Sequence, residues 1–210
     1  HPFVFNGFQE NTYVIEDNDK NCVIVDPGCS TRDEEEELFQ FIEDEGLTPL
    51  ALLGTHAHID HVLGNAFVLS KYDIPYYLHK ADEKTLNAVP QYADLYGFGG
   101  YKLSPEPTNW LEGGETLKFG DFELQVIHAP GHAPGHVVYY WEKEQLLING
   151  DVLFEGSFGR VDLPGGDMNT LKDTIVNKLF VLPEETRVLT GHGNSTTIGK
   201  EKRTNYILQF

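Results

Sequence analysis

Cysteine is scarce in this chain: only Cys22 and Cys29 occur among its 210 residues. Two cysteines are too few for a disulfide scaffold, and a chain of this length buries enough apolar surface to fold without one. A single bridge between the two is open, but reduced thiols are the expectation, because disulfides persist mainly outside the cytosol. The scarcity of cysteine therefore predicts a cytoplasmic protein.

The sequence also lacks any apolar run of the ~20 residues that a membrane-spanning helix requires. No signal peptide is visible, although the chain opens at His1 without a methionine, which leaves its native start open. Basic residues are few: 15 Lys and Arg stand against 33 Asp and Glu, for a net charge of −18. Because nucleic-acid-binding proteins usually show a basic surface, we expect no nucleic acid as partner. The missing apolar run leads us to expect no membrane as partner either. The oligomeric state stays open.

Hydrophobic residues make up 40% of the chain, which together with its length is typical of one globular domain spanning residues 1–210. A capping box at Thr31 and Glu34 predicts the start of a helix, and Asp167 is a second helix cap. Short apolar runs between polar turns predict strands at 3–5, 12–15, 22–25, 50–53, 76–78, 119–126, 137–141, 146–148 and 187–189. Helical spacing predicts helices between 31 and 46, at 66–72, 81–89, from 167 through 179 and at 200–208, with 90–113 as a loop. This mixture indicates an α/β or α+β domain.

The segment Thr55-His56-Ala57-His58-Ile59-Asp60-His61 contains four potential metal ligands. Side chains two residues apart lie on the same side of an extended chain, so we expect His56, His58 and Asp60 to converge. His61 follows one residue later and turns toward a neighbouring position as the chain enters a helix. The pattern favours two adjacent metal sites, and the alternative is a set of buried polar groups satisfied by hydrogen bonds.

A second histidine cluster consists of His128, His132 and His136, separated by two Pro-Gly pairs that predict tight turns. Spacing alone does not say which of the three is a ligand. Asp151 follows the expected strand 146–148, where an aspartate either forms a turn or bridges two divalent metals. His192 lies between two glycines after strand 187–189 and has little to pack against, which favours a metal ligand.

All of these groups, and also Asp26 after strand 22–25, follow an expected strand. Active sites commonly lie on loops at strand ends. Five strand ends that each deliver a carboxylate or an imidazole are hard to explain by packing, so the sequence predicts a metal centre to which Asp26 adds support.

The order Asp26, His56-x-His58-x-Asp60-His61, His132, Asp151, His192 resembles the metallo-β-lactamase superfamily along nearly the whole chain. The resemblance implies a four-layer αββα sandwich, in which two mixed β-sheets are flanked by helices. It implies a first metal site made of His56, His58 and His132, a second made of Asp60, His61 and His192, and Asp151 bridging the two.

The same resemblance gives Asp26 and His136 supporting positions beside the ligands, and it gives His79 and His128 no ligand role. Asp151 distinguishes between subgroups of the superfamily. The commonest dinuclear-zinc β-lactamases have cysteine at this position, whereas glyoxalase II has aspartate, so the resemblance favours the glyoxalase II subgroup. The segments 150–154, 156–166 and 191–201 also resemble short, single-domain bacterial glyoxalase II-like hydrolases. Arg160 occupies a position where glyoxalase II has a basic glutathione contact, which implies substrate binding, with a structural ion pair as the alternative.

The resemblance therefore implies a hydroxyacylglutathione hydrolase-like enzyme that cleaves S-D-lactoylglutathione or a related thioester. The implied cofactor is two divalent metal ions, zinc first, with iron and manganese also compatible with these ligands. Such ions lower the pKa of bound water to about 7, and the hydroxide would attack the thioester carbonyl. Asp60 and Asp151 are the expected catalytic residues, Asp60 by orienting the nucleophile and Asp151 by holding both metals.

One departure from glyoxalase II concerns its C-terminal helical domain, which supplies much of the glutathione pocket. This chain ends 18 residues after His192, so thioester chemistry is better supported than glutathione specificity. Three alternatives stay open: a persulfide dioxygenase with mononuclear iron, another hydrolase such as a lactonase or phosphodiesterase, and a non-catalytic metal-binding domain.

Overall fold

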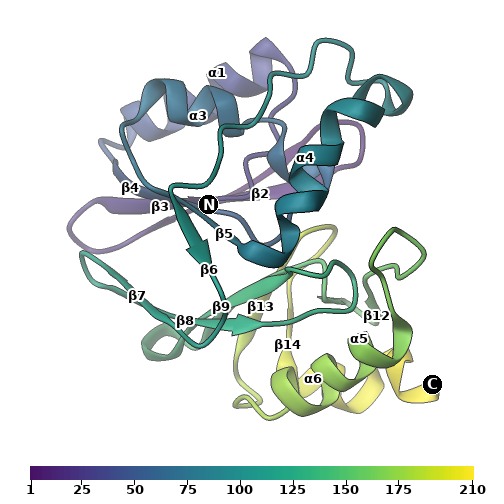
Figure 1. The fold of residues 1–210 in the computed structure, drawn as a ribbon. Helices are drawn as coiled ribbons and strands as arrows, with labels where there is room; N and C mark the ends of the chain where they lie inside the picture. The colour runs from purple at the N-terminus through teal and green to yellow at the C-terminus, as the bar shows by residue number, and fades with distance from the viewer.

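Two six-stranded β-sheets form the middle of the computed structural model, which describes residues 1–210 (Figure 1). Sheet one has the order β1-β2-β3-β4-β5-β6 and consists of β1 (Pro2–Phe5), β2 (Glu10–Glu16), β3 (Asn21–Val25), β4 (Thr48–Leu53), β5 (Tyr76–His79) and β6 (Asn109–Leu111). Its first three strands are antiparallel, and β3 to β6 run parallel. The sheet is therefore mixed.

Sheet two has the order β14-β13-β10-β9-β8-β7, and only β10 and β13 pair in parallel. It consists of β7 (Thr116–Phe119), β8 (Phe122–His128), β9 (Val137–Trp141), β10 (Leu146–Gly150), β13 (Arg187–Thr190) and β14 (Thr196–Thr197). A separate hairpin of β11 (Leu153–Phe154) and β12 (Ser157–Phe158) follows β10. This sheet is mixed as well.

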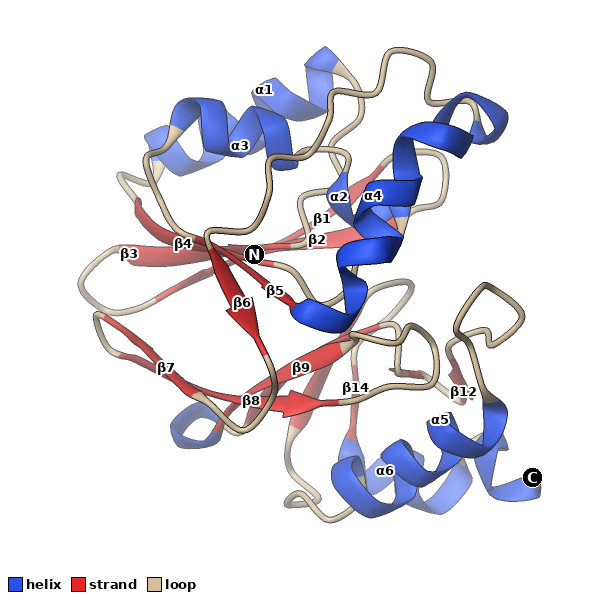
Figure 2. Ribbon diagram, in the orientation of Figure 1, coloured by secondary structure: helices blue, strands red, loops and turns tan.

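Helices cover the outer face of each sheet (Figure 2). On sheet one lie α1 (Arg32–Asp44), α2 (Ile59–Val62), α3 (Asn65–Lys71) and α4 (Glu83–Tyr92), with η1 (Lys80–Asp82) and η2 (Ala93–Tyr96) at the two ends of α4. On sheet two lie α5 (Met168–Thr174), its π-helical continuation η4 (Ile175–Leu179), α6 (Ile198–Thr204) and η5 (Tyr206–Gln209). The short η3 (Glu142–Glu144) joins β9 to β10. No helix combines the length and the hydrophobicity needed to cross a membrane.

Three apolar cores hold these layers together. Between the sheets, Val23 and Leu53 of sheet one pack with Val126, Tyr139 and Ile148 of sheet two. A second core joins sheet one to its helices, and a third joins sheet two to α5, η4 and α6. Strands β3, β9 and β10 are buried on both faces and read as nearly continuous apolar runs, whereas β1, β7 and β8 alternate between exposed residues and buried or half-buried ones. The four-layer αββα sandwich implied by the sequence resemblance is confirmed.

The predicted elements are mostly present, with three differences. The expected strand 119–126 is a hairpin, because Gly120 adopts a φ of 51° in a two-residue turn between β7 and β8. The expected loop 90–113 contains the end of α4, then η2 and the edge strand β6. The expected helix 200–208 breaks at Asn205, whose side chain accepts a hydrogen bond from the backbone of Ile207 and so caps η5.

Candidate metal centre

The polar residues singled out in the sequence meet at one edge of the two sheets. Asp26 follows β3, and the His56–His61 segment follows β4. From sheet two, His132 follows β8, Asp151 follows β10 and His192 follows β13. The carboxyl ends of these strands thus bring together side chains that are up to 166 positions apart (from residue 26 to residue 192).

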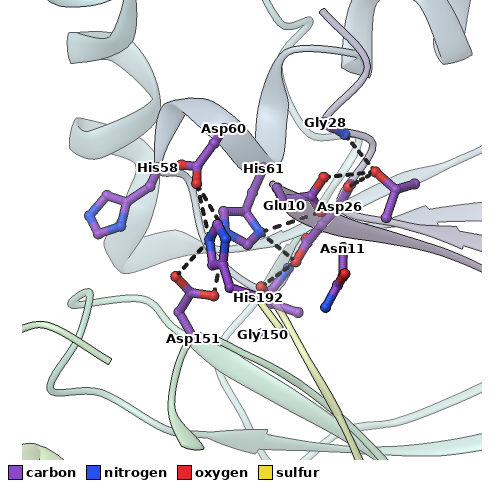
Figure 3. A network of polar contacts seen from close by, with 12 residues as sticks. Glu10, Asn11, Asp26, Gly28, His58, Asp60, His61, Gly150, Asp151 and His192 are labelled. Atoms are coloured by element: carbon purple, nitrogen blue, oxygen red, sulfur yellow. Dashed lines mark hydrogen bonds and ion pairs between the residues drawn. The ribbon is translucent and has the colours of Figure 1, made fainter. Parts of the chain in front are cut away.

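The loop after β4 is held in place by Asp26. This residue has a φ of 46°, a conformation that aspartate tolerates better than most residues. Its carboxylate accepts hydrogen bonds from the Thr55 backbone N–H at 2.7 Å and from the Thr55 hydroxyl at 2.6 Å. The same carboxylate lies 3.1 Å from His61 Nδ1. Asp26 therefore orients both ends of the histidine-rich segment, and Figure 3 shows it beside His61.

A first cluster consists of His56, His58 and His132. His132 Nε2 lies 2.9 Å from His58 Nδ1 and 3.3 Å from His56 Nε2. The other nitrogen of His132, Nδ1, donates to the Arg160 carbonyl at 2.7 Å, which leaves Nε2 as the acceptor. Three imidazole nitrogens therefore point at one position, with the tautomer of His132 already fixed.

A second cluster consists of Asp60, His61 and His192. Asp60 Oδ2 lies 3.2 Å from His192 Nε2 and 3.7 Å from His61 Nε2. The spacing of the segment predicts that Asp60 joins His56 and His58 along an extended chain. Helix α2 begins at Ile59, however, so the backbone turns between His58 and Asp60 and directs the carboxylate to the other cluster.

Asp151 lies between the two clusters. Its Oδ1 is 3.5 Å from His61 Nε2, and its Oδ2 is 3.5 Å from His192 Nε2 and 3.6 Å from His132 Nε2. One carboxylate thus contacts both groups, and Figure 3 shows its contacts with His61 and His192 of the second cluster. This is the arrangement that a bridging ligand requires.

Unsatisfied polar atoms show that these residues fit metal ions. His61 Nε2 and Asp151 Oδ1 are buried and have no hydrogen-bond partner. Buried polar atoms in folded proteins are almost always satisfied, so such orphans at the centre of a ligand set call for an ion. Imidazole nitrogens and carboxylate oxygens are the donors that zinc, iron and manganese accept. The chain therefore offers a site for divalent metals whose identity its ligand types leave open.

The protonation preferences of the two clusters differ. Burial lowers the pKa of His58 to about 3 and that of His56 well below its usual range, and neighbouring imidazoles add to the effect. Burial acts in the same direction on His192, but Asp151 and Asp60 outweigh it and raise its pKa to about 10. Burial thus favours neutral imidazoles at His56 and His58 in the first cluster, whereas in the second cluster the carboxylates favour the protonated form of His192.

The remaining histidines lie outside both clusters. His136 is fully buried, stacks on His56 with ring centroids 4.7 Å apart, and accepts the Asp151 backbone N–H at 3.0 Å. It therefore fixes the loop that carries Asp151. His79 and His128 stack on each other at 4.2 Å and donate to the carbonyls of Glu112 and Pro134.

Three residues that contact this centre escaped the sequence analysis. Glu10 at the start of β2 is fully buried, and its carboxylate lies 3.8 Å from His61 Nδ1. Thr55 links Asp26 to His56, whose Nδ1 is 3.0 Å from the Thr55 hydroxyl. Asp82 accepts the N–H groups of Ala57 and Gly135 at 2.8 and 2.6 Å, and so ties the two histidine loops together. Glu10 lies between the polar residues Gln9 and Asn11, so no local signal in the sequence marks its burial.

A cleft of about 1380 Å³ opens onto the centre. His58, Asp60, His132, Asp151 and His192 all line it. The aromatic residues of the expected loop 90–113 have different positions. Tyr96 lines the cleft, Tyr92 lines it and also packs against the core, and Phe98 and Tyr101 pack against the core. Arg160 also lines the cleft, but its guanidinium forms two hydrogen bonds of 2.7 Å with Asp162.

An αββα sandwich that brings a three-histidine cluster, a histidine–aspartate cluster and an aspartate between them to one sheet edge is typical of the metal-dependent hydrolases built on this fold. The family model of the metallo-β-lactamase superfamily matches residues 5–192. The chain belongs to this superfamily.

Two relatives in sequence cover almost the whole chain. The probable metallo-hydrolase YqgX of Bacillus subtilis is 43% identical, over 95% of this chain and 92% of its own length. The hydroxyacylglutathione hydrolase GloC of Haemophilus influenzae is 37% identical, over 96% of this chain and 94% of its own. These similarities support a metallo-hydrolase.

Two solved structures are similar over the same extent. BLEG-1, a B3 metallo-β-lactamase, matches with a TM-score of 0.91 and 40% identity, covering 100% of this chain and 99% of the other. TTHA1623, in a di-iron-bound form, matches with a TM-score of 0.87 and 42% identity, covering 98% of each chain.

Proposed function

We propose that the protein is a metal-dependent thioesterase of the glyoxalase II type, which hydrolyses S-D-lactoylglutathione or a related small-molecule thioester. The observation that carries this proposal is the position of Asp151, whose two carboxylate oxygens contact both ligand clusters at 3.5–3.6 Å. The similarity to hydroxyacylglutathione hydrolase GloC supports the thioester as substrate.

The proposed ligands are His56, His58 and His132 for one metal and Asp60, His61 and His192 for the other, with Asp151 shared. When bound, divalent ions supply Lewis acidity and lower the pKa of a water molecule to about 7. Zinc is the first candidate, and iron is supported by the di-iron form of the relative TTHA1623.

Within this proposal, Asp60 orients the attacking water. Its carboxylate lies on the cleft wall, is 14% exposed, and is held 3.2 Å from His192 Nε2. A carboxylate fixed at that edge accepts a hydrogen bond from the water and aims its lone pair at the thioester carbonyl. Attack breaks the carbon–sulfur bond and yields a carboxylic acid and a thiol.

No cysteine takes part in the proposed chemistry. Cys22 and Cys29 are both buried and free, and burial raises the pKa of Cys22 to about 12. A thiol with so high a pKa is a poor nucleophile near neutral pH. Two free buried thiols also agree with a reducing, cytoplasmic location, which we include in the proposal.

Arg160 is the proposed contact for an anionic group of the substrate at the rim of the cleft. Its pairing with Asp162 holds the guanidinium in place, and both side chains are more than half exposed. An incoming carboxylate would therefore compete with Asp162 for the two N–H groups that now form the ion pair.

The test is hydrolysis of S-D-lactoylglutathione, followed by loss of thioester absorbance, with protein of measured metal content. We expect Asp151→Ala to lose both metal and turnover, because both clusters lose a shared ligand. Asp73→Ala, an aspartate after α3, is the matched control. Full activity of Asp151→Ala would refute the bridging role. No turnover of S-D-lactoylglutathione by the metal-loaded wild type would refute this substrate, and no turnover of any thioester tested would refute the thioesterase.

A second candidate is β-lactam hydrolysis, which the 40% identity to BLEG-1 favours. Both reactions place a hydroxide on an acyl carbon, so the same preparation can be assayed with a chromogenic cephalosporin. Oxygen consumption with glutathione persulfide in the iron-loaded protein tests the dioxygenase alternative.

A further inference from the structure

The cleft continues beyond the metal centre along helix α4. Lys84, Ala88 and Tyr92 follow one another at intervals of four residues, and all three line the cleft. Residues spaced in this way share one face of a helix, so α4 presents a single stripe to the cleft. Leu95 and Tyr96 in η2 also line it and extend the stripe.

This wall is aromatic and open to solvent. The Tyr96 ring lies 5.6 Å from that of Tyr92 and 5.9 Å from that of Phe8, in the β1–β2 loop. Phe8 and Tyr96 are 42% and 48% exposed, and Leu95 is 86% exposed. Contiguous exposed apolar side chains around a cleft mark a surface that a ligand covers.

A second apolar wall comes from the hairpin β11–β12 and the segment after it. Phe154, Phe158, Leu163 and Pro164 line the cleft there. The Phe154 ring lies 6.1 Å from the ring of His192, so this wall begins at the metal centre. The volume of about 1380 Å³ exceeds the roughly 300–1,000 Å³ of ordinary small-molecule pockets.

Lys84 differs from the other two cations of the cleft. Lys80 pairs with Glu83 at 2.7 Å, and Arg160 pairs with Asp162. Lys84 has no carboxylate partner among the ion pairs of the chain, although it lies on the α4 stripe of a protein with a net charge of −18. An unpaired ammonium beside the apolar stripe supplies a contact for an anion.

We infer that the substrate carries an apolar group of aromatic size next to its scissile bond, held between the α4 wall and the β11–β12 wall, and a carboxylate that meets Lys84. This inference rests on the proposed hydrolase function and specifies its substrate class. A D-lactoyl group is small and polar, and covers little of either wall. The apolar group belongs to the acyl part or to the thiol part of the thioester, and substrates that vary one part at a time distinguish the two.

The experiment compares kcat/KM across two series with the metal-loaded protein. The first varies the acyl group on glutathione: D-lactoyl, hexanoyl and phenylacetyl. The second keeps D-lactoyl and varies the thiol: N-acetylcysteamine against benzyl mercaptan. We expect about a tenfold preference for the aromatic member in one series, the scale of burying one apolar side chain. Equal kcat/KM values within both series would overturn the inference and leave the thioesterase proposal intact.

Variants assign the preference to the α4 wall. Tyr96→Ala and Leu95→Ala should lower kcat/KM for the aromatic substrate about tenfold more than for S-D-lactoylglutathione, while Tyr96→Phe retains the preference. Leu103→Ala is the matched control, because Leu103 is also an exposed leucine, at 67%, but does not line the cleft. An equal loss for both substrates would contradict a role in selectivity.

Direct binding keeps the inference testable if no thioester is hydrolysed. The probe is 4-phenylbutyrate, which combines an aromatic ring with a carboxylate, titrated by calorimetry. Binding should weaken about fivefold in Lys84→Gln and in Tyr96→Ala but not in Lys102→Gln, an exposed lysine outside the cleft. Absence of saturable binding, or no effect of these variants, would overturn the inference whatever the reaction is.

Discussion

Glu10 is a single residue whose effect on the centre depends on its charge state. Its side chain is fully buried, Oε2 lies 2.9 Å from the Thr12 hydroxyl, and Oε1 has no hydrogen-bond partner. Burial raises the pKa of Glu10 well above its usual range, and the nearby His61 offsets only part of that effect. We therefore expect burial to favour the protonated, uncharged form of Glu10 in the metal-free protein.

Two substitutions of Glu10 test this expectation. Glu10→Gln keeps the shape of a neutral carboxyl group and should change the free energy of unfolding by less than about 0.5 kcal/mol. Glu10→Ala leaves a cavity and removes the Thr12 contact, and should cost about 2 kcal/mol. Urea unfolding of the metal-free proteins at pH 7 measures both. If the glutamine variant lost as much as the alanine variant, Glu10 would be ionised and its charge would support His61.

At the scale of elements, the turns after the strands decide how closely the ligand loops approach each other. Gly191, directly after β13, packs against the loop that carries Asp151. A Cβ at this position would lie 2.0 Å from Asp151 Oδ1 and 2.9 Å from His61 Cε1. Real Cβ atoms essentially never come so close to another heavy atom, so only glycine lets β13 deliver His192 beside Asp151.

The corresponding prediction is that Gly191→Ala impairs metal binding more than folding. The added methyl group displaces the Asp151 carboxylate, so we expect metal affinity to fall about 10- to 100-fold, the range seen when a ligand loses its support. Metal content after dialysis and a calorimetric zinc titration measure it. Gly99→Ala is the control, because its nearest atom would be 3.9 Å away. Equal zinc affinities in both variants would contradict the packing argument.

Elements with strong local signals could be predicted from the sequence, and those that depend on tertiary contacts could not. Helix α1 has its capping box at Thr31 and Glu34, which is a local pattern. Strand β6 has only three residues within a segment rich in glycine and proline, and it exists because β5 offers a free parallel edge. Composition carries no signal of such an edge.

The candidate site divides in the same way. The spacing of His56, His58, Asp60 and His61 is a local pattern that indicates metal ligands, so these residues could be selected from the sequence alone. Asp82 could not, because its hydrogen-bond partners, Ala57 and Gly135, lie 25 and 53 positions away in the sequence. The contact between Arg160 and Asp162 is local, but the sequence left an anion contact and an ion pair equally open.

At the scale of the whole molecule, the metal centre lies between two halves that the chain forms one after the other. Sheet one carries His56, His58, Asp60 and His61, and sheet two carries His132, Asp151 and His192. Apart from the apolar core, Asn11 joins the halves at this edge: its side chain donates to the carbonyls of Thr190 and Gly193 at 3.0 and 2.9 Å. Metal ions bound by both halves would therefore link them as well.

Metal removal should for this reason lower the thermal stability of the entire domain. A ligand that binds only the folded state stabilises it by about 2.7 kcal/mol at 100 times its Kd, and a domain of this size shifts by roughly 2–4 °C per kcal/mol. We expect a chelator to lower the Tm by about 5–10 °C and added zinc to restore it. Differential scanning calorimetry with and without chelator measures the change.

The Asp151→Ala variant is the control, because it lacks the carboxylate that contacts both clusters. Its Tm should start at the lower value, and the chelator should lower it by less than half as much as in the wild type. If the chelator removed the metal from the wild type but left its Tm unchanged, the two halves would be held together without the ions.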